Sequence, residues 1–542
     1  MTPQGPNRVR PAPFKKRRAP DFRDEDAVKF LKRGYDALRA HDLKEAGACC
    51  ALVLKYKPKA KEAHFLVGLI AAESEDWPTA KKAFKTVTTF DADHTAAWAQ
   101  LARIYMVMGQ YSNAEHALEH ASRLEPADPL VQDVIGSVYS LLGNQQKALS
   151  WFDKACGGSK SAVFELSRAK SLTFLGNMTE AKKSLLAVIA ERPSAAQAHW
   201  MLSRVETAVN SDHVNQIQKL VAAEPAGSRN LPFLHYACGK EKEDMLDWSG
   251  AFESYNAGAA ARRREVEFDE QAEIAMFNAF EKNFDQEWYE KVPGGGDDPS
   301  PIFIVGQPRT GTTLVERLIT AHSDVRSAGE LQQFGMAIKR SLGATSSKPM
   351  TAEIVERAAT ELDPSSLAQM YQDTTRAVQP DSPRFIDKLP VNYLYVPLIA
   401  AAFPKAKIIH LVRGAMDSCF ASYKQLFAQA YYHSYDQCEM ARHHIRYRKL
   451  MDHYRLIVGP RMLDVHYETL VTDFEPNARK IIDFLGLGWQ EAVLDFHEQD
   501  GAVTTASAAQ VREKAHSRSV GRWRQFENFL GPMKNTLGKA GF

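Results

Sequence analysis

The stretch from Pro301 to Leu331, PIFIVGQPRTGTTLVERLITAHSDVRSAGEL, has the residue types and spacing of a phosphate-binding loop. Gly306 and Gly311 bracket four residues, and two threonines follow them. Glycines let backbone N–H groups approach a phosphate, and a helix beginning near Thr312 would add its dipole and free N–H groups. A loop that binds a nucleoside triphosphate carries lysine at the position of Thr312, whereas this loop contains an arginine, Arg309.

The arginine changes the ligand that the loop is expected to take. A metal-bound triphosphate usually needs the loop lysine and an acidic residue at a strand end. Arginine can hold an oxyanion directly through its planar fork of N–H donors. Arg309 therefore favours an anionic ligand held without a metal, and no metal site is expected.

The sequence around the loop predicts a parallel sheet that would position it. Residues 301–306 form a short apolar run with β-branched residues, as expected of a buried strand. RFIDK, KIIHLV and MLDVHY are further strand candidates, separated by helical stretches such as VPLIAAAF. Alternating strands and helices indicate an α/β domain, in which phosphate ligands bind at the carboxyl ends of the strands.

Two segments of this half resemble the sulfotransferases that use 3′-phosphoadenosine 5′-phosphosulfate. PRTGTTL is similar to their loop for the 5′-phosphosulfate, and IIHLVRGAMDSCFASYKQLF is similar to their segment for the 3′-phosphate. The resemblance covers nearly all of residues 301–535. It points in particular to tyrosylprotein sulfotransferases and to bacterial sulfotransferases preceded by tetratricopeptide repeats.

The resemblance implies roles for residues at matching positions. Glu330 stands where the tyrosylprotein enzymes have their general base, Lys388 where a lysine contacts the phosphosulfate, and Ser507 where a catalytic serine lies. The residues implied to be catalytic are Glu330, Arg309, Lys388 and Ser507. Those implied to bind the co-substrate are Arg309, Thr310, Gly311, Thr312, Thr313, Arg413, Ser418, Tyr467 and Arg522.

Two positions depart from the family. The family has serine eight residues after the arginine that matches Arg413, and this chain has Ala421 there. Ser418 and Ser422 are the nearby hydroxyls, and Ser418 would lie on the same helical face as position 421. The tyrosylprotein enzymes also carry an arginine two residues after the base, where this chain has Gln332.

Structural interpretations compete with the catalytic ones. Lys388 could simply pair with Asp387 or Glu330. His322 and His410 are alternative bases, because cytosolic sulfotransferases use histidine. His410 lies in an apolar strand, which favours a core position, and His322 is expected at the end of the first helix.

The first half of the chain repeats. DLKEA, DWPTA, GQYSNA, GNQQKA and GNMTEA end at Ala46, Ala80, Ala114, Ala148 and Ala181, with spacings of 34, 34, 34 and 33 residues. A period of 34 residues is that of a helix-turn-helix repeat. Prolines 12 residues after some of these alanines, where they would stop the second helix, are Pro58, Pro126 and Pro193. The pattern resembles tetratricopeptide repeats over roughly Asp26 to Ser194.

A later segment, DWSGAFESYNAGAAARRR, is predicted to continue the solenoid to about residue 285, before the polar break VPGGGDDPSP. The predicted organisation is a disordered basic tail (1–25), an all-α tetratricopeptide solenoid (26–285), a linker (286–300) and the sulfotransferase domain (301–542). Such a solenoid binds peptides or proteins, packs on its own second domain or forms a homodimer, and the sequence leaves these alternatives open.

The whole-chain composition predicts a cytoplasmic protein that does not bind nucleic acid. The 542 residues carry a formal net charge of +2, so no global field attracts nucleic acid. The six cysteines include no CxxC pair, the N-terminus has no apolar signal region, and no apolar run reaches the ~18 residues of a membrane span.

Three functions fit the sequence to different degrees. The first is sulfuryl transfer to a hydroxyl of an acceptor, with protein tyrosine, carbohydrate, lipid and small phenol all open. The second is a P-loop kinase or nucleotidase, which the missing loop lysine argues against. The third is an inactive interaction protein, which the retention of Arg309, Glu330, Lys388 and Arg413 argues against.

Overall fold

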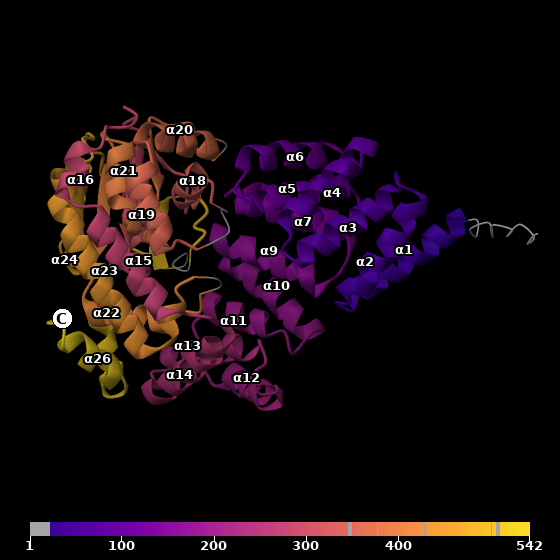
Figure 1. The fold of residues 1–542 in the computed structure, drawn as a ribbon. Helices are drawn as coiled ribbons and strands as arrows, with labels where there is room; N and C mark the ends of the chain where they lie inside the picture. The colour runs from indigo at the N-terminus through magenta and orange to yellow at the C-terminus, as the bar shows by residue number, and fades with distance from the viewer. Residues whose placement is uncertain (1–21, 345–348, 377, 428–429, 500, 506–509) are drawn as a thin grey trace, which may run out of the picture. The chain divides into compact units, whose positions relative to one another are not determined.

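The computed structural model describes residues 22–344, 349–376, 378–427, 430–499, 501–505 and 510–542, and the described residues up to Lys291 form helices joined by turns (Figure 1). These helices are α1 (Asp24–Arg39), α2 (Leu43–Tyr56), α3 (Lys61–Glu73), α4 (Trp77–Phe90), α5 (Thr95–Val107), α6 (Tyr111–Arg123), α7 (Pro129–Leu141), α8 (Gln145–Gly158), α9 (Ala162–Leu175), α10 (Met178–Glu191), α11 (Ala196–Val205), α12 (Asp212–Ala223), α13 (Leu231–Asp244), α14 (Trp248–Glu265), α15 (Glu270–Asn283) and α16 (Gln286–Lys291).

The repeated alanines, turn residues and prolines each have a structural role in the helix pairs. The repeated alanines are fully buried, because each lies in the second helix of a pair where only a small side chain fits. The turn residues before α2 and α8, Asp42 and Asn144, accept a backbone N–H with their side chains and cap these helices. Helix α2 ends two residues before Pro58 and α10 two residues before Pro193. The predicted all-helical repeat region is confirmed.

Contacts divide the chain into two compact units, residues 1–104 and 105–542. The second unit contains the later helices together with all the strands of the described chain. The predicted boundary at residues 286–300 falls where helices give way to the sheet, and as a domain boundary it stays a prediction. Within this stretch, Gly295 and Gly296 donate to the carbonyls of Ala401 and Ala402 at 2.8 and 2.9 Å, so the glycine-rich segment is fastened to the α/β domain.

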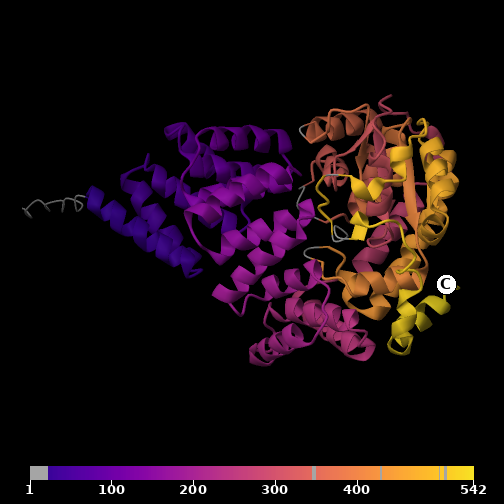
Figure 2. The same cartoon turned by 180° about the vertical axis from the view of Figure 1, so that it is seen from behind.

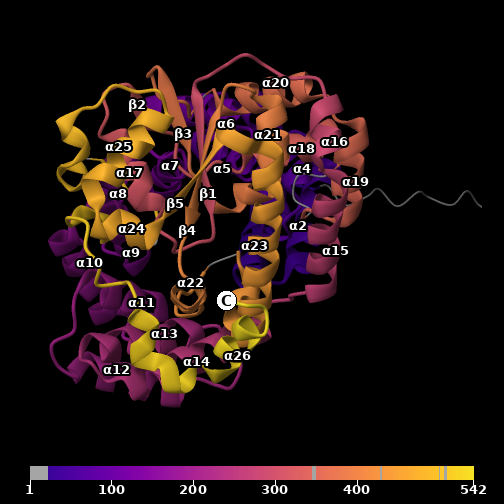
Figure 3. The same cartoon turned by 90° about the vertical axis from the view of Figure 1, so that its left-hand side faces the viewer.

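The strands are β1 (Pro301–Gly306), β2 (Val325–Ser327), β3 (Arg384–Asp387), β4 (Lys407–Val412) and β5 (Met462–His466). They form a five-stranded parallel sheet in the order β2-β3-β1-β4-β5 (Figure 3). The predicted α/β domain with a parallel sheet is confirmed. Strand β2 was not predicted, because its three residues are too few to show a periodic pattern.

Helices cover both faces of the sheet (Figure 3). They are α17 (Thr312–Thr320), α18 (Gln333–Ser341), α19 (Ala352–Glu361), α20 (Pro364–Thr375), α21 (Val396–Ala402), α22 (Ala415–Tyr423), α23 (Gln437–Val458), α24 (Tyr467–Thr472), α25 (Phe474–Phe484) and α26 (Gly531–Gly538), with short 3₁₀ helices that include η1 (Pro390–Tyr395), η2 (Tyr432–Tyr435) and η7 (Arg522–Phe529).

The central strand β1 alternates between two hydrophobic cores. Ile302 and Ile304 pack with residues of α17, α24 and α25. Phe303 and Val305 face the opposite way and pack with residues of α18, α20, α21 and α23. Because successive strand residues point to opposite faces, this continuous apolar run is what a doubly covered parallel sheet needs. The sheet is therefore a rigid frame for the loops at its carboxyl end.

The last helices of the repeat region pack against the α/β domain. Phe277, Phe280 and Phe284 of α15 and its end join the core on the α23 side of the sheet. Helix α14 lies against the orange and yellow segments of the α/β domain (Figure 1 and Figure 2). It contacts η2 and η7, and its Phe252 stacks on Phe529 with 4.9 Å between ring centroids. Within the second unit, these helices are part of the frame of the α/β domain.

Candidate functional site

Every strand of the sheet is followed by a residue that the sequence singled out. Because parallel strands end at one edge, these residues gather there. They are Arg309 after β1, Glu330 after β2, Lys388 after β3, Arg413 after β4 and Tyr467 after β5.

The loop after β1 has its carbonyl groups tied back by side chains. Thr310 Oγ1 donates to the carbonyl of Gln307 at 2.7 Å, and Arg413 donates to the carbonyl of Arg309 at 2.7 Å. Ser422 Oγ donates to the carbonyl between them, that of Pro308, at 3.4 Å. With its acceptors occupied, the loop offers mainly its N–H donors, together with the unpaired N–H groups at the start of α17. This is the arrangement that an anion needs.

Two loop residues adopt left-handed backbone conformations. Arg309 has φ +66° and Gly311 has φ +102°. A Cβ atom at Gly311 would collide with the ring of Tyr467, so only glycine allows the loop and the tyrosine to approach this closely. The next residues, Thr312 and Thr313, begin α17 and are buried. Gly311 thus allows the loop to pack against Tyr467, the first residue of α24 after strand β5.

The side chain of Gln307 anchors the loop to the helices packed behind it. It is fully buried, and its Oε1 accepts from Ser418 Oγ at 2.9 Å and from His444 Nδ1 at 2.7 Å. Burial lowers the pKa of His444 to about 3, so the imidazole is neutral at physiological pH. The hydroxyl of Ser418 is therefore directed to Gln307 behind the loop, not to the pocket, and the predicted role of Ser418 as a co-substrate ligand does not fit this geometry.

The loop opens into a pocket whose lining is rich in cations. Basic side chains outnumber acidic ones in this lining, and both oxygens of Asp417 accept backbone N–H groups, of Gly521 at 2.6 Å and Trp523 at 3.3 Å. The lining residues are Arg309, Gly311, Thr313, Leu314, Arg413, Asp417, Phe420, Ala421, Lys424, Tyr467, Val471, Val511, Glu513, Lys514, Ala515, His516, Ser519 and Arg522.

Arg413 crosses the pocket and is held in place. Its terminal nitrogens donate to the carbonyls of Arg309 at 2.7 Å and Ser519 at 2.6 Å, and its guanidinium lies 4.8 Å from the centre of the Tyr467 ring. Its Nε is buried and has no hydrogen-bond partner among the described residues. Burial, with the nearby Arg204 and Arg413, lowers the pKa of Arg309 to about 10, which still leaves Arg309 charged at neutral pH.

Glu330 and Lys388 form an ion pair at the neighbouring strand ends. Lys388 is 1% exposed and contacts Glu330, whose side chain is 41% exposed. On its other side Nζ lies 3.8 Å from Glu316 Oε2, and Glu316 accepts from Ser327 Oγ at 2.5 Å. Burial opposes the charge on Lys388, but Glu316 and Glu330 outweigh it and raise the pKa of the ammonium. Lys388 therefore stays positive beside a partly open carboxylate.

Both alternative histidine bases are engaged elsewhere. His322 is buried, with Nε2 2.9 Å from the carbonyl of Gly488 and Nδ1 3.1 Å from the backbone nitrogen of Asp324. His410 is buried between Asp464 and Tyr447. The ring nitrogens of both histidines have protein partners, whereas Glu330 is partly exposed, which leaves Glu330 as the base candidate. Glu330 and Lys388 follow neighbouring strands but are not among the residues that line the pocket.

The remaining predicted residues have three kinds of outcome. Tyr467 and Arg522 line the pocket, and Tyr467 hydroxyl lies 2.6 Å from Ser519 Oγ. The hydroxyl of Thr310 donates to a carbonyl of the loop, that of Gln307. Ser507 lies outside the described residues, so its role stays a prediction.

Sequence reasoning missed Gln307, Glu316 and Lys424. Gln307 lies in the loop and Glu316 in the helix that follows it. No sequence spacing identifies a residue whose role is to hold a ligand-binding side chain or loop in place. Lys424 follows Ala421 by three residues on one helix face, and that spacing was a signal for it.

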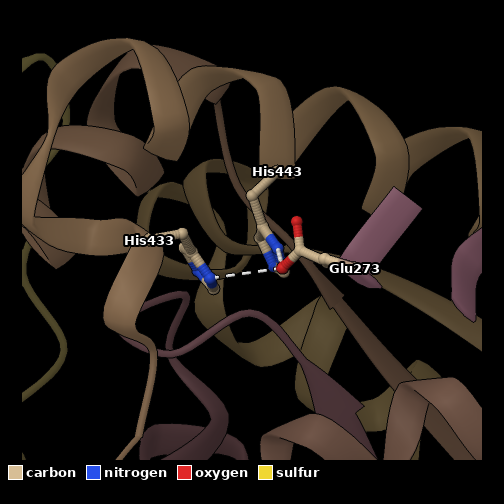
Figure 4. Close-up of side chains that lie close together, drawn as sticks. All are labelled: Glu273, His433 and His443. Carbon is tan, nitrogen blue, oxygen red and sulfur yellow. Dashed lines mark hydrogen bonds and ion pairs between the residues drawn. The ribbon is translucent and has the colours of Figure 1, made fainter. Parts of the chain in front are cut away.

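A second buried cluster lies where α15 meets α23 (Figure 4). Glu273 Oε1 is 2.7 Å from His443 Nδ1 and 3.5 Å from His433 Nδ1, and Arg446 pairs with the other carboxylate oxygen. The two imidazole rings are stacked, with 3.5 Å between centroids and 11° between planes. A metal ion bonds an imidazole in the plane of its ring, and two stacked parallel planes share no such point. The geometry is that of a hydrogen-bonded cluster that joins α15 to α23 and η2.

Two regions of the chain match models of known protein families. Residues 301–491 match the model of the sulfotransferase family, and residues 71–137 match that of the tetratricopeptide repeat. One part of the chain is thus similar to the sulfotransferase family and another to tetratricopeptide repeats, and the resemblance predicted from the sequence is confirmed.

Individual relatives are similar over part of their length. An uncharacterized protein of Aquifex aeolicus is 28% identical over 379 residues, which are 68% of this chain and 49% of that protein. The protein-tyrosine sulfotransferase of Drosophila melanogaster is 30% identical over 200 residues, 36% of this chain and 40% of that protein. The chain thus spans half or less of these two relatives. The sulfotransferase domain of the Synechococcus PCC 7002 olefin synthase aligns with 22% identity and a TM-score of 0.32, over 43% of this chain and 89% of that domain.

Among the described residues, no helix combines the length and the apolar composition needed to cross a membrane.

Proposed function

We propose that residues 301–542 transfer a sulfuryl group from 3′-phosphoadenosine 5′-phosphosulfate to a hydroxyl group of an acceptor. The observation that carries the proposal is one pocket in which an arginine-containing phosphate loop, Arg413 and Tyr467 meet. The match of residues 301–491 to the sulfotransferase family model supports it.

The pocket residues fit a ligand with two anionic groups. The loop and the first turn of α17 supply N–H donors at one part of the pocket, with Arg309 beside them. Arg413 brings a buried Nε with no partner among the described residues, and an unpartnered buried donor is costly unless a ligand engages it. Lys424 and Arg522 add further positive charge to the lining.

The ion pair at the strand ends suits the proton and charge transfers of this reaction. Glu330 is partly exposed and would take the proton of the acceptor hydroxyl as its oxygen bonds to sulfur. The bond from sulfur to the bridging phosphate oxygen breaks, and adenosine 3′,5′-bisphosphate leaves. Lys388 and Arg309 would stabilise the charge on that oxygen, with the predicted help of Ser507.

For the acceptor we propose a tyrosine side chain of a protein or peptide, with the repeats as the protein-binding scaffold. Relatives named protein-tyrosine sulfotransferases, from Drosophila melanogaster and Danio rerio, support this choice. Gln332 cannot supply the positive charge that an arginine would give there, so we expect a weaker demand for acidic residues around the tyrosine.

The proposal is tested by labelling. The protein is incubated with donor carrying radioactive sulfur and a lysate, and the labelled product is identified by mass spectrometry. We expect label on tyrosine of a protein. Label on a carbohydrate or lipid would correct the acceptor class, and no transfer to any component would contradict the activity.

A further inference from the structure

We infer that Glu243, a carboxylate of the helical repeat region, positions Lys424 and Arg522 to bind the 3′-phosphate of the nucleotide. The inference rests on the proposed function and adds to it. It makes the repeat region a structural part of the donor site.

Glu243 contacts two basic residues of the pocket lining, Lys424 and Arg522. Lys424 Nζ lies 2.7 and 3.0 Å from the two carboxylate oxygens, and Arg522 Nε donates to Oε1 at 3.1 Å. Glu243 is at the end of α13, whereas Lys424 follows α22 and Arg522 begins η7. One carboxylate of the repeat region thus joins two segments of the α/β domain.

The carboxylate itself is firmly held. Its side chain is 10% exposed, and Tyr255 of α14 donates to Oε2 at 2.9 Å. Burial opposes its ionisation, but Lys424, Tyr255 and Arg522 outweigh burial and lower the pKa of Glu243. Trp248, also of α14, lies under the Arg522 guanidinium at 4.7 Å from the ring centre. The two helices therefore fix both the anion and one of its cations.

The charge balance leaves the pair of cations able to bind an anion. Glu243 contributes one negative charge against two positive ones. It engages at most two of the three N–H donors of Lys424 and the Nε–H of Arg522, so donors remain on both side chains. Both residues line the pocket together with Ala421.

This arrangement also explains how the pocket works without the family's serine at position 421. Ser418 donates to Gln307, and Ser422 donates to the carbonyl of Pro308. Neither hydroxyl is available in place of the missing one. Lys424 lies one helical turn after Ala421 and replaces a neutral donor with a charged one.

The test compares two nucleotides, adenosine 3′,5′-bisphosphate and adenosine 5′-monophosphate, by calorimetry on the full chain. Their difference in affinity reports the 3′-phosphate alone. We expect the parent to prefer the bisphosphate, and Lys424→Met to reduce that preference about tenfold, as expected for loss of a hydrogen bond between charged groups. Glu243→Gln should reduce it about three- to tenfold while the monophosphate binds as in the parent.

A double variant separates positioning from general support of the fold. If Glu243 acts through Lys424, Glu243→Gln should have a smaller effect in the Lys424→Met background than in the parent. Asp244→Asn is the matched control, because Asp244 neighbours Glu243 on α13 but pairs with Lys240 at 2.7 Å. It should leave the preference unchanged. If Glu243→Gln does not fold, Glu243→Asp keeps the charge but withdraws the carboxylate from Lys424 and Arg522, and it should lower the preference in the same direction.

The outcomes separate this inference from the proposed function. An unchanged or greater bisphosphate preference in Glu243→Gln would overturn the role of Glu243, and the same result in Lys424→Met would overturn that of Lys424. Either result would leave the proposed function standing. A parent that binds both nucleotides equally would contradict the proposed donor itself.

Discussion

At the scale of single residues, Lys388 shows how the site holds a charge in a buried position. A lysine removed from water is costly unless it is paired, and here Glu316 and Glu330 flank it. Glu316 is buried and bound to Ser327, whereas Glu330 is partly exposed. The two carboxylates therefore differ in access: both favour the charged form of the lysine, but only Glu330 is accessible to solvent, as the proposed general base must be.

Replacing Glu330 with glutamine should stop proton acceptance while leaving the donor site intact. We expect Glu330→Gln to lower turnover by about 10²–10⁴ and to bind adenosine 3′,5′-bisphosphate nearly as the parent does. Turnover is measured with the acceptor found by labelling. Glu356→Gln, on the exposed face of α19, is the control. Equal turnover in Glu330→Gln and the parent would remove Glu330 from the mechanism.

Position 421 can be tested by restoring the hydroxyl. Ala421 lines the pocket, so Ala421→Ser should tighten adenosine 3′,5′-bisphosphate binding by about 1–2 kcal/mol. Ser418→Ala should instead lower thermal stability, because it removes a buried donor from Gln307. Calorimetry and thermal unfolding measure the two effects. A large loss of nucleotide affinity in Ser418→Ala, with no change in Ala421→Ser, would reverse these assignments.

At the scale of elements, the sequence predicted those features that a local pattern encodes. The strands β1, β3, β4 and β5 are apolar runs with sharp ends, and the residues directly after them are found at one edge of the sheet. Ser418 shows the limit: helical spacing places it near Ala421, but only the packing of α22 under the loop reveals that Gln307 takes its hydroxyl. Glu243 shows the other limit, since no local pattern connects residue 243 to residues 424 and 522.

The hydrogen bond from α23 to the loop should make stability depend on pH. The pKa of His444 is lowered from 6.5 to about 3, so below pH 6.5 the unfolded chain binds a proton that the folded chain does not. Stability therefore falls with decreasing pH, by about 1.4 kcal/mol per pH unit for this group.

We expect His444→Gln to show a smaller loss of stability than the parent between pH 7.5 and pH 5.5, by about 1 kcal/mol. Melting temperatures at the two pH values provide the comparison. His116→Gln, an exposed histidine of α6, should behave as the parent does. The same pH dependence in all three proteins would show that His444 titrates in its folded environment as it does in the unfolded chain.

At the scale of the whole molecule, the second compact unit decides where the chain can be cut. Phe277, Phe280 and Phe284 are buried in the same core as strand β1, and Phe252 and Tyr255 pack with the elements around η7. A cut after residue 285, the predicted end of the solenoid, would expose the partners of these residues to water.

A fragment of residues 94–542, which keeps α5 whole, should fold and bind adenosine 3′,5′-bisphosphate. A fragment of residues 286–542 should be insoluble or unfolded, because each lost Phe contact costs about 3–5 kcal/mol and total stability is about 5–15 kcal/mol. Circular dichroism and calorimetry compare the two. A soluble, nucleotide-binding 286–542 fragment would show that the repeat region is dispensable for the donor site.

The measurement that bears most directly on the sulfotransferase proposal is the choice between adenosine 3′,5′-bisphosphate and ATP. The loop carries Thr312 where a triphosphate-binding loop has lysine, and it contains Arg309. Arg413, Lys424 and Arg522 add a second region of positive charge to the pocket lining. Calorimetry on the full chain, with and without magnesium, should show bisphosphate binding at least tenfold tighter than ATP binding, and magnesium should not change that order. Tighter binding of magnesium–ATP would contradict the proposal and favour a phosphoryl-transfer enzyme.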